Sequence, residues 1–154
     1  MKICPSTLSF ICCLASISPG TTVVFFQVGF FRVLEMTKRY RLVTVAIISV
    51  GSWTPPISQA YDRLTPRERS DLIQAGVVAD TCAFVFGEDG RLIPGLSDRR
   101  IGIPLADLQA VPRVIALAGG EAKAKAIQAL LFSGIPEALV TDEITARALL
   151  NSPS

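Results

Sequence analysis

Two adjacent glycines, Gly119 and Gly120, follow the apolar run Val114–Ala118, and Lys123 comes three residues after them. Glycine lets the backbone turn sharply and lets a ligand approach the main chain closely. If a helix begins at this turn, its first amides have no partner within the helix, and together with the helix dipole they favour an anion. With the positive charge of Lys123 beside them, these residues predict a turn that captures the phosphate of a small molecule.

Helical geometry separates Lys123 from Lys125. At about 100° per residue, Lys123 lies between Ile127 and Leu130, on the apolar side that should pack on a sheet. Lys125 lies on the opposite, solvated side. Because open α/β sheets bind ligands at the ends of their strands, we expect Lys123 to face the ligand. The alternative that spacing alone leaves open is that both lysines only make the helix soluble.

The remaining pattern alternates strands and helices that would position this turn. Expected strands are 42–48, 79–86, 114–118 and 138–140; expected helices are 65–75, 104–110, 143–150 and the segment from the glycine turn to about residue 133, with a loop at 55–56. Thr65, Pro66 and Glu68 form a capped helix start, and Thr141 or Asp142 caps the last helix. Apolar strands alternating with helices indicate an α/β fold with a mainly parallel sheet.

Composition excludes several classes of site. The 154 residues suit one domain, and a net charge of +2 without a basic run does not mark a nucleic-acid surface. Histidine is absent, which removes histidine-based triads and histidine metal ligands. The cysteines, Cys4, Cys12, Cys13 and Cys82, lack metal-ligand spacing and are interpreted as small apolar residues in a reduced compartment. We expect no metal and no cofactor.

The chain divides near residue 35. Residues 1–34 carry only two charged side chains, Lys2 and Arg32, and are strongly apolar. Three interpretations stay open: a secretory signal, a membrane anchor interrupted at Pro19-Gly20, or a start that is not part of the ancestral domain. We expect a domain over 35–154.

Five segments in order resemble the C-terminal part of the sugar-binding domain of SorC-type, DeoR-related transcriptional regulators. They are Val45–Trp53, Gly76–Cys82, Asp98–Ile103, Ala118–Lys123 and Leu139–Glu143. The resemblance covers roughly three quarters of the chain. It implies a partial Rossmann-like sheet related to glucosamine-6-phosphate deaminases and ribose-5-phosphate isomerases, and an effector site for a phosphorylated sugar.

The resemblance also implies the residues of that site. They are the glycine turn, a phosphate-contacting lysine, an acidic contact for sugar hydroxyls and a strand-end pair, which fall on Gly119, Gly120, Lys123, Asp80, Gly51 and Ser52. Val50 replaces a smaller residue usual in the family. The alternative for Asp80 is a solvated or helix-capping carboxylate.

The helix-turn-helix domain that the family places first is not recognisable in this sequence. The resemblance therefore implies a truncated sugar-phosphate-binding module of a cytoplasmic transcriptional regulator. We expect no enzymatic activity, no direct DNA binding and a tendency to self-associate through uncovered sheet surfaces. Two alternatives stay open: a sugar-phosphate isomerase or deaminase, and a secreted or membrane-attached protein.

Overall fold

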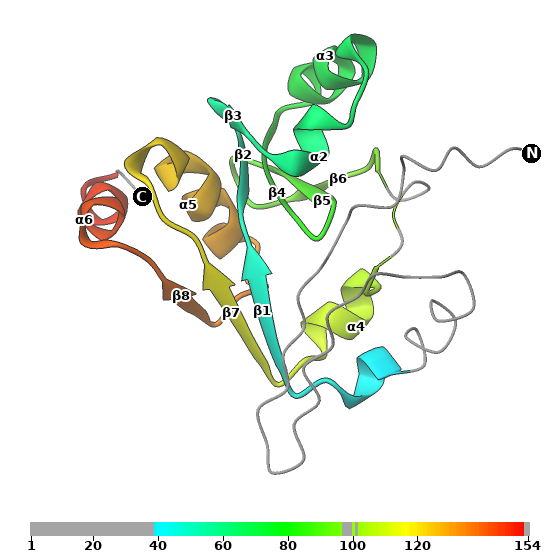
Figure 1. Ribbon diagram of the computed structural model, residues 1–154, viewed down its shortest axis with the longest axis vertical. Helices are drawn as coiled ribbons and strands as arrows, with labels where there is room; N and C mark the ends of the chain where they lie inside the picture. The colour runs from blue at the N-terminus through cyan, green and yellow to red at the C-terminus, as the bar shows by residue number, and fades with distance from the viewer. Residues whose placement is uncertain (1–38, 97–99, 101, 153–154) are drawn as a thin grey trace, which may run out of the picture.

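The computed structural model describes residues 39–96, 100 and 102–152, which form two sheets and five α-helices (Figure 1). The strands are β1 Val45–Ser49, β2 Gly51–Trp53, β3 Pro56–Ile57, β4 Val77–Thr81, β5 Phe84–Gly87, β6 Leu92–Ile93, β7 Arg113–Leu117 and β8 Ala138–Val140. The helices are α2 Gln59–Asp62, α3 Pro66–Gln74, α4 Leu105–Gln109, α5 Ala124–Phe132 and α6 Glu143–Asn151, with 3₁₀ turns at Tyr40–Leu42 and Glu121–Lys123. The expected boundary near residue 35 and the apolar segment before it lie outside the described residues.

The first sheet is parallel, with the order β1-β7-β8. Its inner face buries alternate residues of β1 and β7, such as Ile48 and Val114, in one cluster with Ile127 and Leu130 of α5. In Figure 1, β1 and β7 lie side by side, and α6 lies next to α5. Strands that alternate with helices in this way are typical of Rossmann-like folds, and the predicted α/β fold class is confirmed.

The second sheet is antiparallel, with the order β3-β2-β4-β5-β6, and sequence analysis did not predict it. The chain passes from the first sheet to the second at Val50, the single residue between β1 and β2. The hydroxyl of Thr81 on β4 donates to the carbonyl of Ser49 at 2.7 Å. The two sheets are therefore joined at the carboxyl end of β1.

The prediction of one strand over 79–86 is wrong. The chain forms β4 and β5, which pair as an antiparallel hairpin. The turn residues Cys82 and Ala83 adopt φ angles of 50° and 58°. Two left-handed residues fit the tight turn of a hairpin, but neither is Gly, Asn or Asp, so the usual sequence signal for such a turn is missing.

Of the other local predictions, the helix start at Thr65 is confirmed and the loop at 55–56 is wrong in part. The helix start at Thr65 is confirmed, with the complete capping box between Thr65 and Glu68 and with Pro66 in the first turn. The helix after the glycine turn begins with a 3₁₀ turn before α5. The proline loop is wrong in part, since Pro56 pairs with Trp53 in the edge strand β3. Proline is tolerated on an edge strand because it needs no ladder donor there.

The outer face of the parallel sheet carries exposed apolar side chains. Leu117 on β7 is 55% exposed and Val140 on β8 is 53% exposed. Parallel sheets are normally covered on both faces, so this face is unusually open for a sheet of its kind. None of the helices in the described part of the chain has the length and apolar character needed to cross a membrane.

Candidate functional site

The carboxyl ends of the three parallel strands bring together segments that are far apart in the sequence. Val50 follows β1, the glycine turn at Gly119 and Gly120 follows β7, and Asp142 lies two residues after β8. In Figure 1, β1 leads into β2, whereas β7 leads toward α5 and β8 toward α6. This edge is where open α/β sheets bind ligands, and the predicted glycine turn lies on it.

Lys123 turns back from the glycine turn toward the junction of the two sheets. Its Nζ donates to the carbonyl oxygen of Val50 at 3.2 Å, and the side chain is half-buried. The contact agrees with the expectation that Lys123 faces the sheet. Lys125 points elsewhere, since its Nζ forms an ion pair with Glu88 at 3.0 Å and half of its side chain is exposed. The two lysines therefore have different surroundings, as helical geometry predicts.

Asp80 is a buried carboxylate on β4. It is 8% exposed. Its Oδ1 accepts a hydrogen bond from the indole nitrogen of Trp53 at 2.8 Å and another from the hydroxyl of Ser58. The alternative reading of Asp80 as a solvated or helix-capping group is wrong. Trp53 and Ser58 escaped sequence analysis because they lie 27 and 22 residues before Asp80, and no local spacing links them to it.

Two opposing effects act on the protonation of Asp80. Burial removes water from the carboxylate and raises its pKa above the ordinary value. The hydrogen bonds from Ser58 and Trp53 and the positive charge of Lys123 favour the ionised form and offset part of this rise. Asp80 and Lys123, which the sequence places 43 residues apart, are thus electrostatically coupled in the fold.

Gly51 lies directly opposite Asp80 in the ladder between β2 and β4. A Cβ atom at Gly51 would lie 2.3 Å from Oδ1 of Asp80, far inside van der Waals contact. Because Trp53 and Ser58 hold this carboxylate in place, only glycine leaves room for it. The structure therefore brings three of the predicted site residues, Gly51, Asp80 and Lys123, to one region.

We predict that Gly51→Ala destabilises the fold by about 1–3 kcal/mol, the usual cost of forcing an extra methyl group into a packed site. The variant should have a lower urea midpoint in unfolding monitored by circular dichroism. Gly102→Ala is the matched control, because its added Cβ would meet only a terminal nitrogen of Arg100 at 3.4 Å. Equal midpoints for the two variants would contradict the close approach at Asp80.

Ser52 differs from its neighbour Gly51. Its side chain has no exposed surface, and its hydroxyl has no hydrogen-bond partner among the described residues. A buried hydroxyl of this kind is costly. Ser52 therefore lies behind the surface of the candidate site.

The glycine turn is held by a contact that sequence analysis missed. The amide of Gly120, which has a φ of 98°, donates to Oδ2 of Asp142 at 2.7 Å. Asp142 also caps α6, as expected, by accepting from the Thr145 amide at 2.8 Å. The hydrogen bonds from the Thr145 amide and then from the Gly120 amide lower the pKa of Asp142 to about 2. The cap has a sequence signal, but the bond to Gly120 depends on the packing of β7 beside β8.

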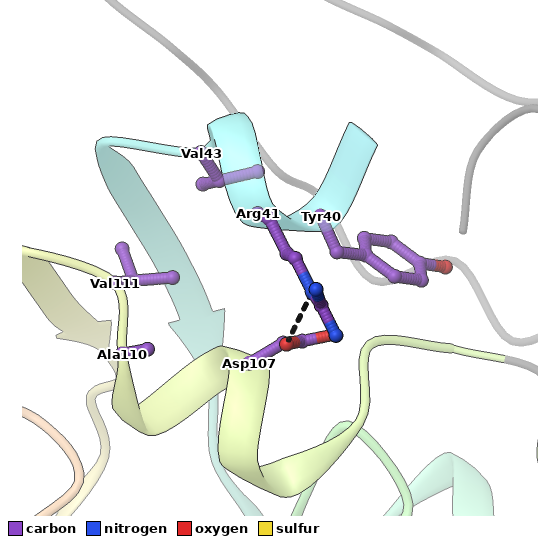
Figure 2. Close-up of a pocket in the computed structure, with 6 residues that line it drawn as sticks. All are labelled: Tyr40, Arg41, Val43, Asp107, Ala110 and Val111. Atoms are coloured by element: carbon purple, nitrogen blue, oxygen red, sulfur yellow. Dashed lines mark ion pairs between the residues drawn. The ribbon is translucent and has the colours of Figure 1, made fainter. Parts of the chain in front are cut away.

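A separate hollow lies at the opposite end of the parallel sheet (Figure 2). It has a volume of about 320 Å³ and is lined by Tyr40, Arg41, Val43, Asp107, Ala110 and Val111. Arg41 and Asp107 form an ion pair of 3.6 Å across it, as Figure 2 shows. Its residues precede β1 and β7, whereas the candidate site follows them. The hollow contains none of the predicted site residues.

Comparisons with known proteins relate the chain to one family and to several solved structures. The family described as "Putative sugar-binding domain" matches residues 29–151. The transcriptional regulator LsrR of Klebsiella pneumoniae is 42% identical over 77 residues, which cover 49% of this chain and 24% of that protein. The chain thus spans about a quarter of the length of this curated relative.

Solved structures of transcriptional regulators also resemble this chain. A DeoR family transcriptional regulator from Listeria monocytogenes matches with a TM-score of 0.66 and 25% identity, over 77% of this chain and 49% of that chain. The full-length sorbitol operon regulator SorC from Klebsiella pneumoniae matches with a TM-score of 0.70 over 77% of this chain and 39% of that chain. Its identity of 24% supports a common fold only.

Proposed function

Because the chain belongs to the sugar-binding domain family of transcriptional regulators, we propose that it binds a phosphorylated sugar at the carboxyl edge of its parallel sheet. The observation that carries the proposal is the position of Lys123. It lies three residues after Gly120, its ammonium group lies at the carbonyl of Val50, and its charge acts on the buried Asp80. A cation beside a helix start and a nearby carboxylate suit a ligand with a phosphate at one end and hydroxyl groups at the other.

In this proposal the ammonium group of Lys123 and the amides of Glu121 and Ala122 hold the phosphate. Asp80 accepts a hydrogen bond from a sugar hydroxyl, and Gly51 leaves the space that the Asp80 carboxylate occupies. Ser52 is fully buried and does not contact the ligand in this proposal. Val50 does not obstruct it, because its side chain is buried in the core and only its carbonyl faces Lys123.

We propose further that the chain acts as an effector module of a cytoplasmic regulator. The named relatives are transcriptional regulators. A regulator of this kind needs a DNA-binding part, and a net charge of +2 on 154 residues does not mark one. The effector signal would then be passed to DNA by another part of the protein.

An isomerase or deaminase is not proposed. Proton abstraction beside a carbonyl needs a carboxylate base that can reach the substrate. Asp142 has a pKa lowered to about 2 and is a weak base. Asp80 is held by the hydrogen bonds that its Oδ1 accepts from Trp53 and Ser58. In this proposal its other oxygen accepts from a sugar hydroxyl, so the carboxylate is not free to take a proton from carbon.

The direct test is calorimetric titration of the full chain with a panel of mono- and bisphosphorylated sugars, with the unphosphorylated sugars as controls. We expect heat of binding from at least one sugar phosphate and none from its unphosphorylated counterpart. Equal binding of both would contradict a phosphate site, and no binding by any member of the panel would contradict the proposed function.

For the domain boundary we propose that residues 35–154 fold without the apolar segment 1–34. Deletion of residues 1–34 should raise the soluble fraction and leave the circular dichroism spectrum essentially that of the folded chain, since exposed apolar segments promote association. Deletion of residues 1–28 is the matched control, because it leaves the whole family match intact. If only the longer deletion unfolds the protein, residues 29–34 belong to the domain and the boundary is wrong.

A further inference from the structure

The carboxylate of Asp142 connects the start of α6 to the glycine turn after β7. Its Oδ1 accepts from the amide of Thr145, and its Oδ2 accepts from the hydroxyl of Thr145 at 2.8 Å and from the amide of Gly120 at 2.7 Å. Thr145 is fully buried. Asp142 is therefore fixed from the α6 side by a side chain that cannot move freely, and it holds the turn through one hydrogen bond.

The peptide groups of Gly120 are fixed on both sides. Its amide is held by Asp142, and its carbonyl accepts from the amide of Lys123 at 2.8 Å. The backbone of Gly119 also lies close to the Asp142 carboxylate, since a Cβ atom on Gly119 would lie 2.5 Å from Oδ2 of Asp142. A chain of contacts thus runs from Asp142 through Gly120 to the backbone of Lys123, the residue expected to hold the phosphate.

The same contacts show that a phosphate cannot simply take the amide of Gly120. That donor is already used by a carboxylate, and the low pKa keeps the carboxylate ionised at neutral pH. A second anion at this point would meet like charge. The donors left for a phosphate are the amides of Glu121 and Ala122 and the ammonium group of Lys123, since the Lys123 amide already donates to the carbonyl of Gly120. The direction of these donors depends on the conformation of the turn.

We propose that Asp142 is a positioning residue of the sugar-phosphate site, which holds the amide of Gly120 so that the turn directs Lys123 and its preceding amides toward the ligand. This inference rests on the proposed function. Asp142 does not touch the ligand; it acts through Gly120. A competing role, in which Asp142 occupies the anion position and a phosphate must displace it, makes the opposite prediction for its removal.

Two substitutions separate positioning from helix capping. Ser is as good an N-cap as Asp, so Asp142→Ser keeps the start of α6, but its side chain is too short to reach Gly120. Asp142→Asn keeps the length, but the amides of Thr145 and Gly120 contact different oxygens of Asp142. The NH₂ group of asparagine would therefore face one of these two donors and lose that hydrogen bond. Thr65→Ala is the matched control, because it removes the cap of α3 and not the turn.

The experiment combines amide hydrogen exchange by NMR with calorimetry on the full chain, using the sugar phosphate that binds best in the panel. In Asp142→Ser we expect faster exchange at Gly120, an almost unchanged melting temperature, and binding weakened by about three- to tenfold, the effect of losing one ordinary hydrogen bond. Asp142→Asn should also weaken binding. Thr65→Ala should lower the melting temperature and leave both Gly120 exchange and affinity unchanged.

Tighter binding in Asp142→Ser would overturn the proposal and identify Asp142 as a competitor of the phosphate. Unchanged affinity with faster Gly120 exchange would overturn it too, since the turn would then not need its anchor. If the wild-type chain binds no sugar phosphate, the proposed function fails, and the role of Asp142 at the ligand fails with it. Gly120 exchange then reports separately on the anchor: protection lost in Asp142→Ser supports it, and unchanged protection overturns it.

Discussion

Lys123→Ala should weaken binding of a sugar phosphate by about 1.5–3 kcal/mol, the range for hydrogen bonds to charged groups, which is roughly ten- to over a hundredfold in affinity. The reason is geometric. Lys123 is half-buried at the junction of the two sheets, beside the carbonyl of Val50 and within the electrostatic reach of Asp80. A charge in such partly dry surroundings is screened less than a surface charge.

Lys125→Ala is the matched control, because Lys125 lies only two residues further on, in the first turn of α5. Its ammonium group pairs with Glu88, and exposed pairs of this kind contribute little. We expect its affinity to stay within about twofold of the wild type. Lys123→Met adds a second comparison, because it keeps the apolar stem and removes only the charge.

Calorimetric titration of Lys123→Ala, Lys123→Met and Lys125→Ala with the sugar phosphate measures these differences in affinity. Equal losses in Lys123→Ala and Lys125→Ala would show that the two lysines act only through net charge. Normal binding by Lys123→Met would show that the stem, and not the ammonium group, matters.

Asp80→Ala should destabilise the fold strongly, whereas Asp80→Asn should not. Alanine leaves the buried indole N–H of Trp53 and the hydroxyl of Ser58 without their acceptor, at a cost of about 1–3 kcal/mol for each donor. Asparagine keeps one carbonyl oxygen in place of Oδ1, which receives both hydrogen bonds. Urea unfolding measures the difference, with Asp62→Ala as an exposed control that should change stability by less than about 0.5 kcal/mol.

The pH dependence of Asp80 has a definite sign. Its folded-state pKa is raised by burial, so the neutral form is favoured in the folded protein. The resulting contribution to stability is full below the unfolded pKa and is lost as the pH rises through the folded pKa. Relative to Asp80→Asn, the wild type should therefore become less stable as the pH rises from about 4 toward neutrality.

Parallel urea titrations of the two proteins across that range check this prediction. A constant difference between them would mean that Asp80 has an ordinary pKa in the fold. Because sugar hydroxyls donate to an ionised carboxylate, Asp80→Asn should also weaken ligand binding while keeping the fold. That combination separates a binding role from a purely structural one.

The sequence by itself determined the features that rest on neighbouring residues. The capping box at Thr65 and Glu68 needs only a four-residue spacing, and the cap at Asp142 needs only the residues after it. The orientation of Lys123 relative to Lys125 follows from the helical repeat. The parallel strands were found because each is a continuous apolar run, the pattern typical of parallel strands, although only the inner face of this sheet is buried.

The tertiary structure alone decided what depends on distant residues. The division of 79–86 into β4 and β5 follows from pairing across the hairpin. Cys82 and Ala83 adopt left-handed backbone conformations in its turn, which these residue types do not predict. Asp80 acquires its partners only when β2 lies against β4, and Asp142 meets Gly120 only when β8 lies beside β7. Such contacts join residues more than 20 positions apart, and their geometry is set by strand register, which no local pattern of residue types specifies.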